Sequence, residues 1–261
     1  METESLTAEA IQSGLPTLVV GKRLFVHKTL PSTMDEAFRL AKDGAPEGTV
    51  VLADNQTRGR GRFQRSWLSQ PGACVLASII FRPTLVQLPL LNMAASLAVV
   101  RAVRRYPGVR ATIKWPNDVL VGGRKLCGML LDSYLSGDGV EFAVVGIGLN
   151  VNMDVQKFPE IAPIATSLSA QVGREVSRLT VVHCLLEDID IYLSYVKDGA
   201  PVQDEWRRNV STIGQRVKVS VAGKNLEGFA QGVSDNGDLL LRSDDGSVTA
   251  LSSGEVSLSG F

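Results

Sequence analysis

The chain has 261 residues, of which 44% are hydrophobic and 21% charged, which is enough apolar material for one sizeable core and a smaller second unit. Its 27 basic residues equal its 27 acidic residues. A formal net charge of zero argues against any general attraction to nucleic acid or an anionic membrane, so anion recognition must be local.

The N-terminal residues and the use of cysteine and histidine predict a cytoplasmic protein. The start of the chain is acidic and polar, unlike a secretory signal, and no apolar run approaches the roughly 20 residues that span a bilayer. Cys74, Cys127 and Cys184 lack the close spacing of zinc or disulfide pairs, so we expect small core residues in a reducing compartment. His27 and His183 have no second ligand at metal spacing, and we assign no metal ligand.

The first 106 residues predict strands and helices in alternation. Thr33 and Glu36 stand at capping-box spacing ahead of an apolar helical face, and Gly44 ends the pattern, so a helix is expected to begin near residues 32–34. Apolar residues at spacings of three and four then predict a long buried helix that stops at Pro107. The long helix covers 88–106, and the strand-like segments are 24–27, 49–53 and 74–81.

The next part of the chain predicts a sheet followed by helices. Short turns join four strand candidates, and a helical apolar pattern then returns before a short amphipathic segment around Trp206. The four strands are at 112–115, 119–121, 125–132 and 140–150, and the helix is at 179–196. This order predicts an α+β fold, a mixed or antiparallel sheet with flanking helices, rather than a doubly wound parallel sheet.

The composition changes near Ser211. From there apolar residues alternate in strand fashion, with Asn-Gly and Asp-Gly hairpin signals at 236–237 and 245–246. Four or five short strands in about 50 residues are typical of a small barrel. We therefore divide the chain into a larger domain at 1–210 and a small β-barrel domain at 211–261.

The most unusual segment, residues 54–67, contains four arginines and two glycines in a chain of otherwise balanced charge. Glycines let a backbone approach a ligand closely, and the planar guanidinium can bind a phosphate or carboxylate at two points. The segment therefore predicts a loop that folds over an anion. A solvated basic turn and an RNA-contacting loop are the alternatives that composition alone leaves open.

A second motif, Lys-Trp-Pro-Asn-Asp at 114–118, places a cation and a carboxylate on either side of a rigid turn, and Lys125 opens the next strand. A lysine close to an aspartate keeps its charge and can be fixed in direction, which stabilising a phosphate or a pentavalent transition state requires. An ordinary hairpin salt bridge would explain the same residues. Neither motif resembles the usual phosphate loop.

Taken together, the motifs resemble the biotin protein ligase family. They occur in the family's order and at ordinary spacing through residues 24–168, and the Gly-Arg-Gly-Arg and Lys-Trp-Pro-Asn-Asp motifs are highly specific in combination. The C-terminal strand pattern also fits, since the family commonly ends in a small SH3-like domain. The matching segments are 32–35, 59–62 with Arg65 and Trp67, 114–118, 125–128, 146–152 and 165–168.

The resemblance implies an enzyme that activates biotin with ATP as biotinyl-5'-AMP and transfers the biotin to a lysine of a biotin carboxyl carrier protein. It implies catalytic roles for Arg60, Arg62, Lys125 and Asp118, with Asp118 orienting or deprotonating the acceptor amine. The residues implied to bind biotin are Ser32, Thr33, Gln56, Gly59, Arg60, Gly61, Arg62, Lys125 and Gly128. The residues implied to bind ATP are Arg60, Arg62, Arg65, Trp67, Lys114, Asn117 and Asn150. Mg²⁺ would accompany ATP without a dedicated carboxylate cluster.

Two departures from the family pattern qualify this interpretation. Met34 stands where an asparagine is frequent, and only about 20 weakly patterned residues precede the catalytic segment, where some members carry a DNA-binding winged helix. We therefore expect a monofunctional enzyme, monomeric or homodimeric, that binds neither nucleic acid nor membranes. A lipoate-type ligase with the same acyl-adenylate chemistry is the alternative enzyme, and a nucleic-acid-binding module is the alternative from another class.

Overall fold

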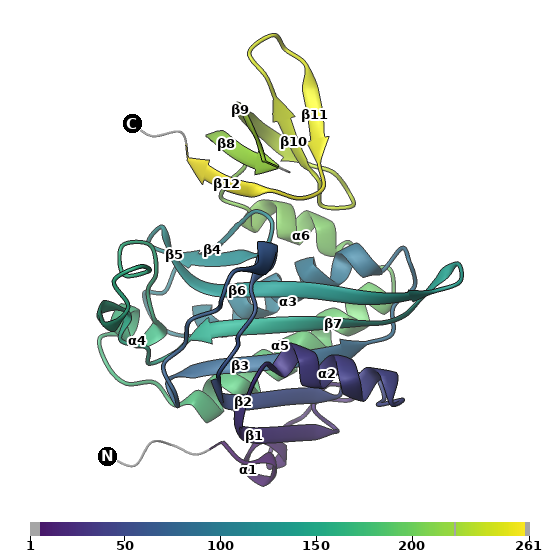
Figure 1. Cartoon of the computed structure of the whole chain (residues 1–261), viewed down its shortest axis with the longest axis vertical. Coiled ribbons are helices and arrows are strands. Elements are labelled where there is room, and N and C mark those ends of the chain that lie inside the picture. Colours follow the sequence, from purple (N-terminus) through teal and green to yellow (C-terminus); the bar gives the residue numbers. More distant parts are fainter. Residues whose placement is uncertain (1–5, 222, 259–261) are drawn as a thin grey trace.

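The computed structural model describes residues 6–221 and 223–258, which form a large layer of sheet and helices with a small sheet at one end (Figure 1). The large sheet has seven strands in the order β1-β2-β3-β7-β6-β5-β4. β1 and β2 run parallel, and each other neighbouring pair runs antiparallel. This mixed sheet confirms the predicted α+β fold. Its strands are β1 (Leu24–Leu30), β2 (Val50–Gln56), β3 (Cys74–Phe81), β4 (Ala111–Lys114), β5 (Asp118–Val121), β6 (Arg124–Ser136) and β7 (Gly139–Asn150).

Helices cover both faces of the large sheet, which explains why its central strands are apolar almost throughout. Val51, Ile80 and Val144 pack in the cluster beneath α2, whereas neighbouring residues of the same strands pack beneath α3 and α5. The three helices predicted at 32–44, 88–106 and 179–196 are confirmed as α2, α3 and α5. The helices are α1 (Ala8–Gln12), α2 (Thr33–Lys42), α3 (Leu88–Arg104), α4 (Leu168–Val172), α5 (Arg178–Lys197) and α6 (Val202–Asn209), with 3-10 turns η1 (Arg62–Gln64) and η2 (Val155–Lys157).

The C-terminal strands form a second, antiparallel sheet of five strands in the order β11-β10-β9-β8-β12. The alternation seen in the sequence is reproduced in β8, where Val217 and Val219 are fully buried. This sheet stands beyond the end of the large sheet at which β4 and β5 lie (Figure 1). Its strands are β8 (Arg216–Val221), β9 (Lys224–Val233), β10 (Leu239–Arg242), β11 (Val248–Leu251) and β12 (Glu255–Leu258).

One buried tryptophan joins the second sheet to the first, and another joins α6 to α3. Trp115 Nε1 donates to the carbonyl of Gly237, in the β9–β10 turn, over 2.8 Å, and the Trp115 backbone N–H donates to Thr212 Oγ1 over 3.0 Å. Trp206 of α6 donates from Nε1 to Ser96 Oγ of α3 over 3.0 Å. Both tryptophans are 1% exposed. The β4–β5 turn is therefore fixed from the side of the C-terminal sheet.

Two of the three cysteines have the environment of fully buried core residues, and Cys184 is partly buried against the core. Cys74 and Cys127 are fully buried, and burial raises the pKa of the Cys74 thiol to about 11 and that of Cys127 further still. Within the ranges the structure describes, no three His, Cys, Asp or Glu side chains converge as a metal site would require. None of the described helices combines the length and the apolar character needed to cross a bilayer.

Trp206→Ala is expected to lower the free energy of unfolding by roughly 3–5 kcal/mol, because it removes a fully buried indole and leaves a cavity between α6 and α3. Urea denaturation of the two proteins measures the difference. Tyr195→Ala, which truncates an aromatic side chain that is 41% exposed on α5, is the control and should cost less than about 1 kcal/mol. Equal losses in both variants would contradict the role given to Trp206.

Candidate active site

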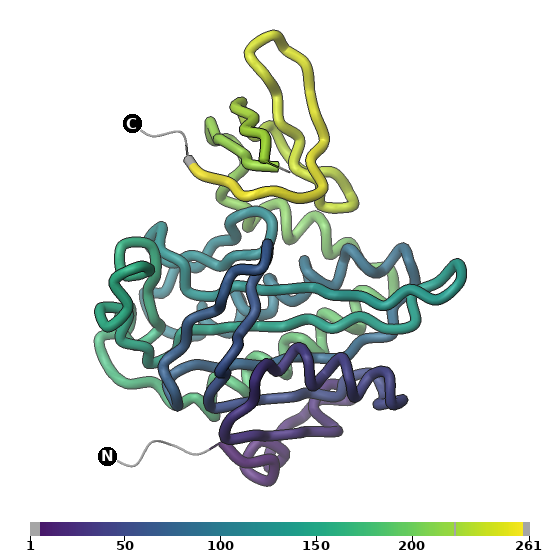
Figure 2. The backbone as a smooth tube through the Cα atoms, viewed as in Figure 1, coloured from purple at the N-terminus to yellow at the C-terminus, as the bar shows by residue number. Residues whose placement is uncertain are grey.

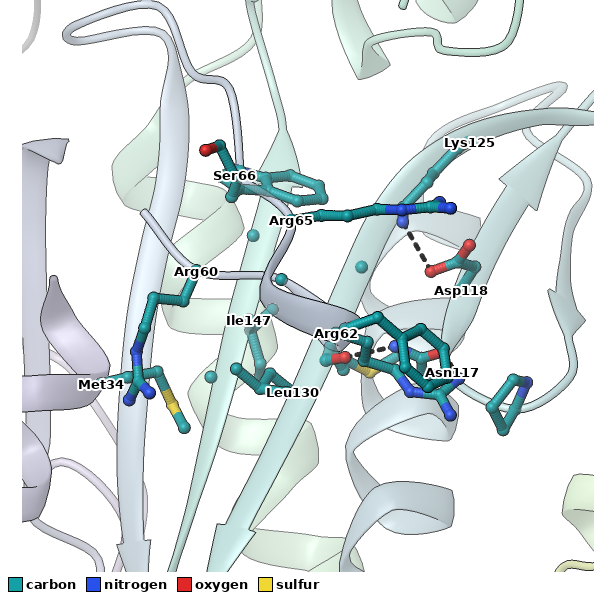
Figure 3. A pocket seen from close by; sticks show the side chains of 18 of the residues that line it. Met34, Arg60, Arg62, Arg65, Ser66, Asn117, Asp118, Lys125, Leu130 and Ile147 are labelled. Carbon is teal, nitrogen blue, oxygen red and sulfur yellow. Dashed lines mark hydrogen bonds and ion pairs between the residues drawn. The ribbon is translucent and has the colours of Figure 1, made fainter. Parts of the chain in front are cut away.

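A cavity lies where the two sheets approach each other, between β6, β7, the β4–β5 turn, β12 and the arginine loop, which we define as residues 58–67 (Figure 3). The loop follows β2 and crosses the large sheet toward β12, as the blue tube in Figure 2 shows. The cavity therefore takes its walls from segments far apart in the chain. The sequence-predicted residues that line it are Thr33, Gln56, Arg60, Gly61, Arg62, Arg65, Trp67, Lys114, Asn117, Asp118, Lys125 and Gly128.

The floor of the cavity is made by glycines on β6 and β7. Gly128 and Gly148 are register partners, and the Trp67 ring lies against both. A Cβ added at Gly128 would come within 2.8 Å of Trp67 Cζ3, and one added at Gly148 within 2.6 Å of Cζ2. Only glycine leaves room for the indole here. Lys125 Nζ lies 5.4 Å from the centroid of the same ring.

The arginine loop closes on itself through backbone hydrogen bonds. Trp67 N–H donates to the Gly59 carbonyl over 2.9 Å, and Gly61 N–H donates to the Arg65 carbonyl over 2.7 Å. At the tip, Phe63 and Gln64 have φ of 54° and 59°, a left-handed conformation that is costly outside glycine. The loop is thus a tight turn with a strained tip, and Arg62 and Arg65 lie on either side of that tip.

Three of the loop's arginines, Arg60, Arg62 and Arg65, are held by acceptors from other elements. Arg60 is paired with Asp35 of α2 at 3.0 Å and with Asp132 of β6 at 3.3 Å. Two carboxylates therefore already compensate the charge of Arg60, which lines the cavity as part of this ion-pair network. In Figure 3 it lies beside Met34, on the opposite side of the cavity from Lys125.

Arg62 has a different environment, because its nearest acceptors are neutral. One of its terminal nitrogens donates to Asn117 Oδ1 and to the Gly254 carbonyl, both at 3.1 Å. Burial lowers the pKa of the Arg62 guanidinium, while the negative charges of Asp118 and Glu255 act in the opposite direction. A partly desolvated cation with neutral partners gains much from an arriving anion.

On the other side of the cavity, Lys125 Nζ pairs with Asp118 Oδ1 at 2.7 Å, which is the fixed lysine expected from the sequence (Figure 3). The Lys125 backbone is fixed too, because its N–H donates to the Ile164 carbonyl and its carbonyl accepts from Thr166 N–H. Lys114 lines the same region, and within the described ranges no carboxylate lies within ion-pair distance of it.

The end of the cavity near α2 is a hydrogen-bonding cluster. Thr33 donates to Gln56 Oε1 from both its backbone N–H, at 2.7 Å, and its hydroxyl, at 3.0 Å, and Ser78 Oγ donates to Thr33 Oγ1 at 2.8 Å. The buried Ser32 hydroxyl has no hydrogen-bond partner among the described residues. Next to this cluster, the Met34 thioether fills the space above Gly146.

Three predicted residues are absent from the cavity lining as described. Ser32 lies one residue before the lining residue Thr33, and Gly59 supports the loop where a Cβ would press on the Trp67 carbonyl at 2.8 Å. Asn150 is 2% exposed and donates from its amide to the Thr166 carbonyl over 3.0 Å. Asn150 thus contacts the segment that flanks Lys125, which is a supporting position.

Comparison with known proteins accounts for this architecture. The profile of the biotin/lipoate A/B protein ligase family matches residues 26–152, and that of the biotin protein ligase C terminal domain matches residues 212–259. The chain is 39% identical to the bifunctional ligase/repressor BirA of Bacillus subtilis, over 92% of this chain and 76% of that protein. It is 32% identical to the biotin–[acetyl-CoA-carboxylase] ligase of Mycobacterium tuberculosis, over 88% and 86%. The chain belongs to the biotin protein ligase family.

A solved member of the family has the same fold. The biotin protein ligase from Aquifex aeolicus in complex with biotin and ATP superposes with a TM-score of 0.76 at 31% identity, covering 91% of this chain and 98% of that one. The resemblance stated from the motifs is therefore confirmed. The arginine loop, the Lys-Trp-Pro-Asn-Asp turn and the glycine floor meet in one cavity of a biotin protein ligase fold.

Sequence reasoning missed the residues that hold the cations in place. Asp132, a partner of Arg60, and Glu255, the partner of Arg65, carry no local motif. Asp35, the other partner of Arg60, lies in the 32–35 motif, but no role was assigned to it. Their pairings span up to 190 residues. The sequence signal for this cluster of ion pairs was the excess of arginine at 54–67 in a chain of zero net charge. So many arginines in one loop require carboxylates from other parts of the chain.

Gly148→Ala is expected to push Trp67 off the sheet, because the added methyl group has no space beneath the indole. The variant should lose roughly 1–3 kcal/mol of unfolding free energy. Its tryptophan emission should shift to longer wavelength, since Trp115 and Trp206 stay buried. Gly232→Ala in β9 is the control, because a Cβ there meets nothing within 4 Å. An unshifted spectrum in Gly148→Ala would show that the indole does not lie on this floor.

Proposed function

We propose that this chain activates biotin with ATP to biotinyl-5'-AMP and transfers the biotin to a lysine of a biotin carboxyl carrier protein. The observation that carries the proposal is the composition of one cavity: arginine and lysine side chains face it from one end, and a hydrogen-bonding cluster lies at the other. A bicyclic ureido ring with a carboxylate tail needs such a pair of ends. We place the chain in the cytoplasm, with the domain boundary between residues 210 and 211.

The ureido ring of biotin fits the end formed by Thr33 and Gln56. Gln56 Oε1 accepts two hydrogen bonds from Thr33, so its amide nitrogen is directed elsewhere and can donate to a ligand. The unpartnered Ser32 hydroxyl supplies a further polar group at this end. Gly128 and Trp67 then provide a narrow apolar passage for the aliphatic tail.

The carboxylate tail of biotin would reach the cations. There it must approach the α-phosphate of ATP, although the two anions repel each other. In the first step a carboxylate oxygen of biotin attacks the α-phosphorus of ATP, and the bond from that phosphorus to the bridging oxygen breaks to release pyrophosphate. Arg62 and Lys125 stabilise the charge on the α-phosphate as it grows. Arg60 lines the end of the cavity that would hold biotin. Arg65 and Lys114 supply charge for the remaining phosphates, and Asn117 holds Arg62 in direction.

In the second step the acceptor lysine amine attacks the acyl carbon, and AMP leaves with the phosphate oxygen. Asp118 is the group that we assign to orient or deprotonate the amine, since its carboxylate lies in the cavity wall beside Lys125. Mg²⁺ would travel with ATP, held by phosphates and water. We assign it no protein ligand, because Asp118 and Glu255, the two carboxylates that line the cavity among the described residues, are already paired with Lys125 and Arg65.

The contact with ATP that the resemblance implied for Asn150 stays a proposal, and the position of Asn150 favours an indirect effect on the nucleotide. Asn150 bonds to Thr166, whose N–H bonds to the Lys125 carbonyl. We infer that it acts on the nucleotide through this segment.

Incubation of the chain with ATP, Mg²⁺, biotin and a biotin carrier domain, followed by intact mass measurement of the carrier, tests the proposal. One added biotinyl group per carrier, absent when ATP is omitted, is expected. Parallel incubation with lipoate and its carrier domain separates the alternative ligase. Modification by lipoate in place of biotin, or of neither carrier, would sink the proposal.

Lys125→Ala is expected to slow adenylation by roughly 10²–10³, because the ammonium acts on charge that develops in the transition state. Pyrophosphate release measures the rate. The matched control is Lys218→Ala, which removes an exposed lysine from β8 of the C-terminal sheet. The melting temperature should stay near that of the unaltered chain, since the backbone bonds of Lys125 remain. Release at the normal rate would assign the transition-state cation elsewhere.

Arg62→Gly is expected to release biotinyl-5'-AMP into solution faster, because the intermediate loses a charge-assisted contact while the cluster around Thr33 and Gln56 remains. Biotin should then appear on exposed lysines of albumin mixed with the variant. A streptavidin blot detects it, and Arg216→Gly, which removes an exposed arginine of β8, is the control. Continued pyrophosphate release without added albumin labelling would mean that Arg62 does not retain the intermediate.

A further inference from the structure

The arginine loop is anchored to the C-terminal sheet at two adjacent residues. Arg65 meets Glu255, the first residue of β12, at two points: Nη2 donates to Oε2 over 2.6 Å, and Nη1 pairs with Oε1. Arg62 donates to the carbonyl of the preceding residue, Gly254, over 3.1 Å. Gly254 and Glu255 also line the cavity itself, so the C-terminal sheet supplies part of its wall.

We propose that Glu255 is a positioning residue, which holds Arg65 and with it the arginine loop in the conformation that receives ATP. The proposal rests on the function proposed above. It adds that the C-terminal sheet acts on nucleotide binding through one carboxylate, before any ligand is present.

The donor inventory of arginine makes this arrangement workable. A guanidinium has five N–H donors in a fixed plane, and a carboxylate that engages its two terminal nitrogens leaves three donors for a phosphate. Glu255 therefore fixes the plane of the Arg65 guanidinium and leaves its three other N–H donors free to bind a phosphate. Its charge also lies close enough to support the protonated form of the partly buried Arg62.

The conformation of the loop explains why an anchor is needed. Phe63 and Gln64 both adopt left-handed backbone conformations at the tip, and each such residue is disfavoured relative to extended or helical backbone. A free loop would relax away from this turn. Arg62, which contacts Gly254, and Arg65, which contacts Glu255, lie on either side of the tip, and these contacts oppose that relaxation.

The Arg65–Glu255 ion pair is weak, so its loss should lower ATP affinity by a small factor and not abolish binding. Arg65 is 66% and Glu255 40% exposed as side chains, and an exposed pair shifts an equilibrium by a factor of roughly two to five. Without the anchor, a smaller fraction of the protein would hold the receptive loop, and the apparent ATP affinity falls by that fraction. Once ATP is bound its phosphates hold the arginines, so turnover at saturation should stay nearly constant.

The experiment compares Glu255→Gln with the unaltered chain in pyrophosphate release at saturating biotin. We expect the KM for ATP to rise roughly two- to fivefold while kcat stays within a factor of two. Asp244→Asn is the matched control, because it breaks another two-point pair of the same sheet, Arg216–Asp244, away from the cavity. An unchanged or lower KM in Glu255→Gln, or the same rise in Asp244→Asn, overturns the proposal.

Hydrogen exchange of the ligand-free chain tests the anchor without reference to the reaction. The amides of residues 60–66 should exchange faster in Glu255→Gln and in Arg65→Glu, and the exchanged pair Arg65→Glu with Glu255→Arg should restore protection. Equal exchange in all four proteins overturns the proposal. If the unaltered chain makes no biotinyl-5'-AMP, the proposed function fails, yet this measurement still decides whether Glu255 holds the loop.

Discussion

The site depends on concentrating positive charge in a chain whose net charge is zero. Cations that face one another in a cavity repel, and a carboxylate that pairs with a cation offsets this repulsion. Arg60 has Asp35 and Asp132, Lys125 has Asp118, and the pairs come from four different elements. The carboxylates hold the cations in direction before a ligand arrives, which reduces the reorganisation that ligand binding requires. The large sheet and its helices are the frame that brings these pairs together.

The β4–β5 turn shows how one motif serves both structure and chemistry. Trp115 is buried and bonds to Gly237 and Thr212, so the middle of the motif is fixed by the C-terminal segment. Asn117 and Asp118 then emerge on the cavity side, where they meet Arg62 and Lys125. A displacement of the C-terminal sheet would therefore move both polar groups of the turn.

The sequence predicted most elements and the arginine-loop and Lys-Trp-Pro-Asn-Asp motifs, because both are local signals. The long apolar helices α3 and α5 and the short amphipathic segment around Trp206 all appear where periodicity indicated. α1 and α4 were missed, since five residues are too few to show a helical period. The carboxylate partners of the arginines were missed for another reason, whereas Asp118, the partner of Lys125, was predicted from its motif. An aspartate or glutamate without a motif acquires its role from the fold, and sequence spacing says nothing about which arginine it will meet.

Arg62 differs from Arg60 and Arg65, the other arginines that line the cavity, because no carboxylate in the described part of the chain pairs with it. Among the described residues its hydrogen-bond acceptors are an amide oxygen and a backbone carbonyl, one from the β4–β5 turn and one from the C-terminal segment. Neutral acceptors satisfy its donors without cancelling its charge, and burial makes that charge costly. Arg62 therefore gains more from an anion than Arg60, whose charge is already compensated. Binding of a phosphate at Arg62 would thus be coupled to both acceptors, and through them to the large and the small sheet.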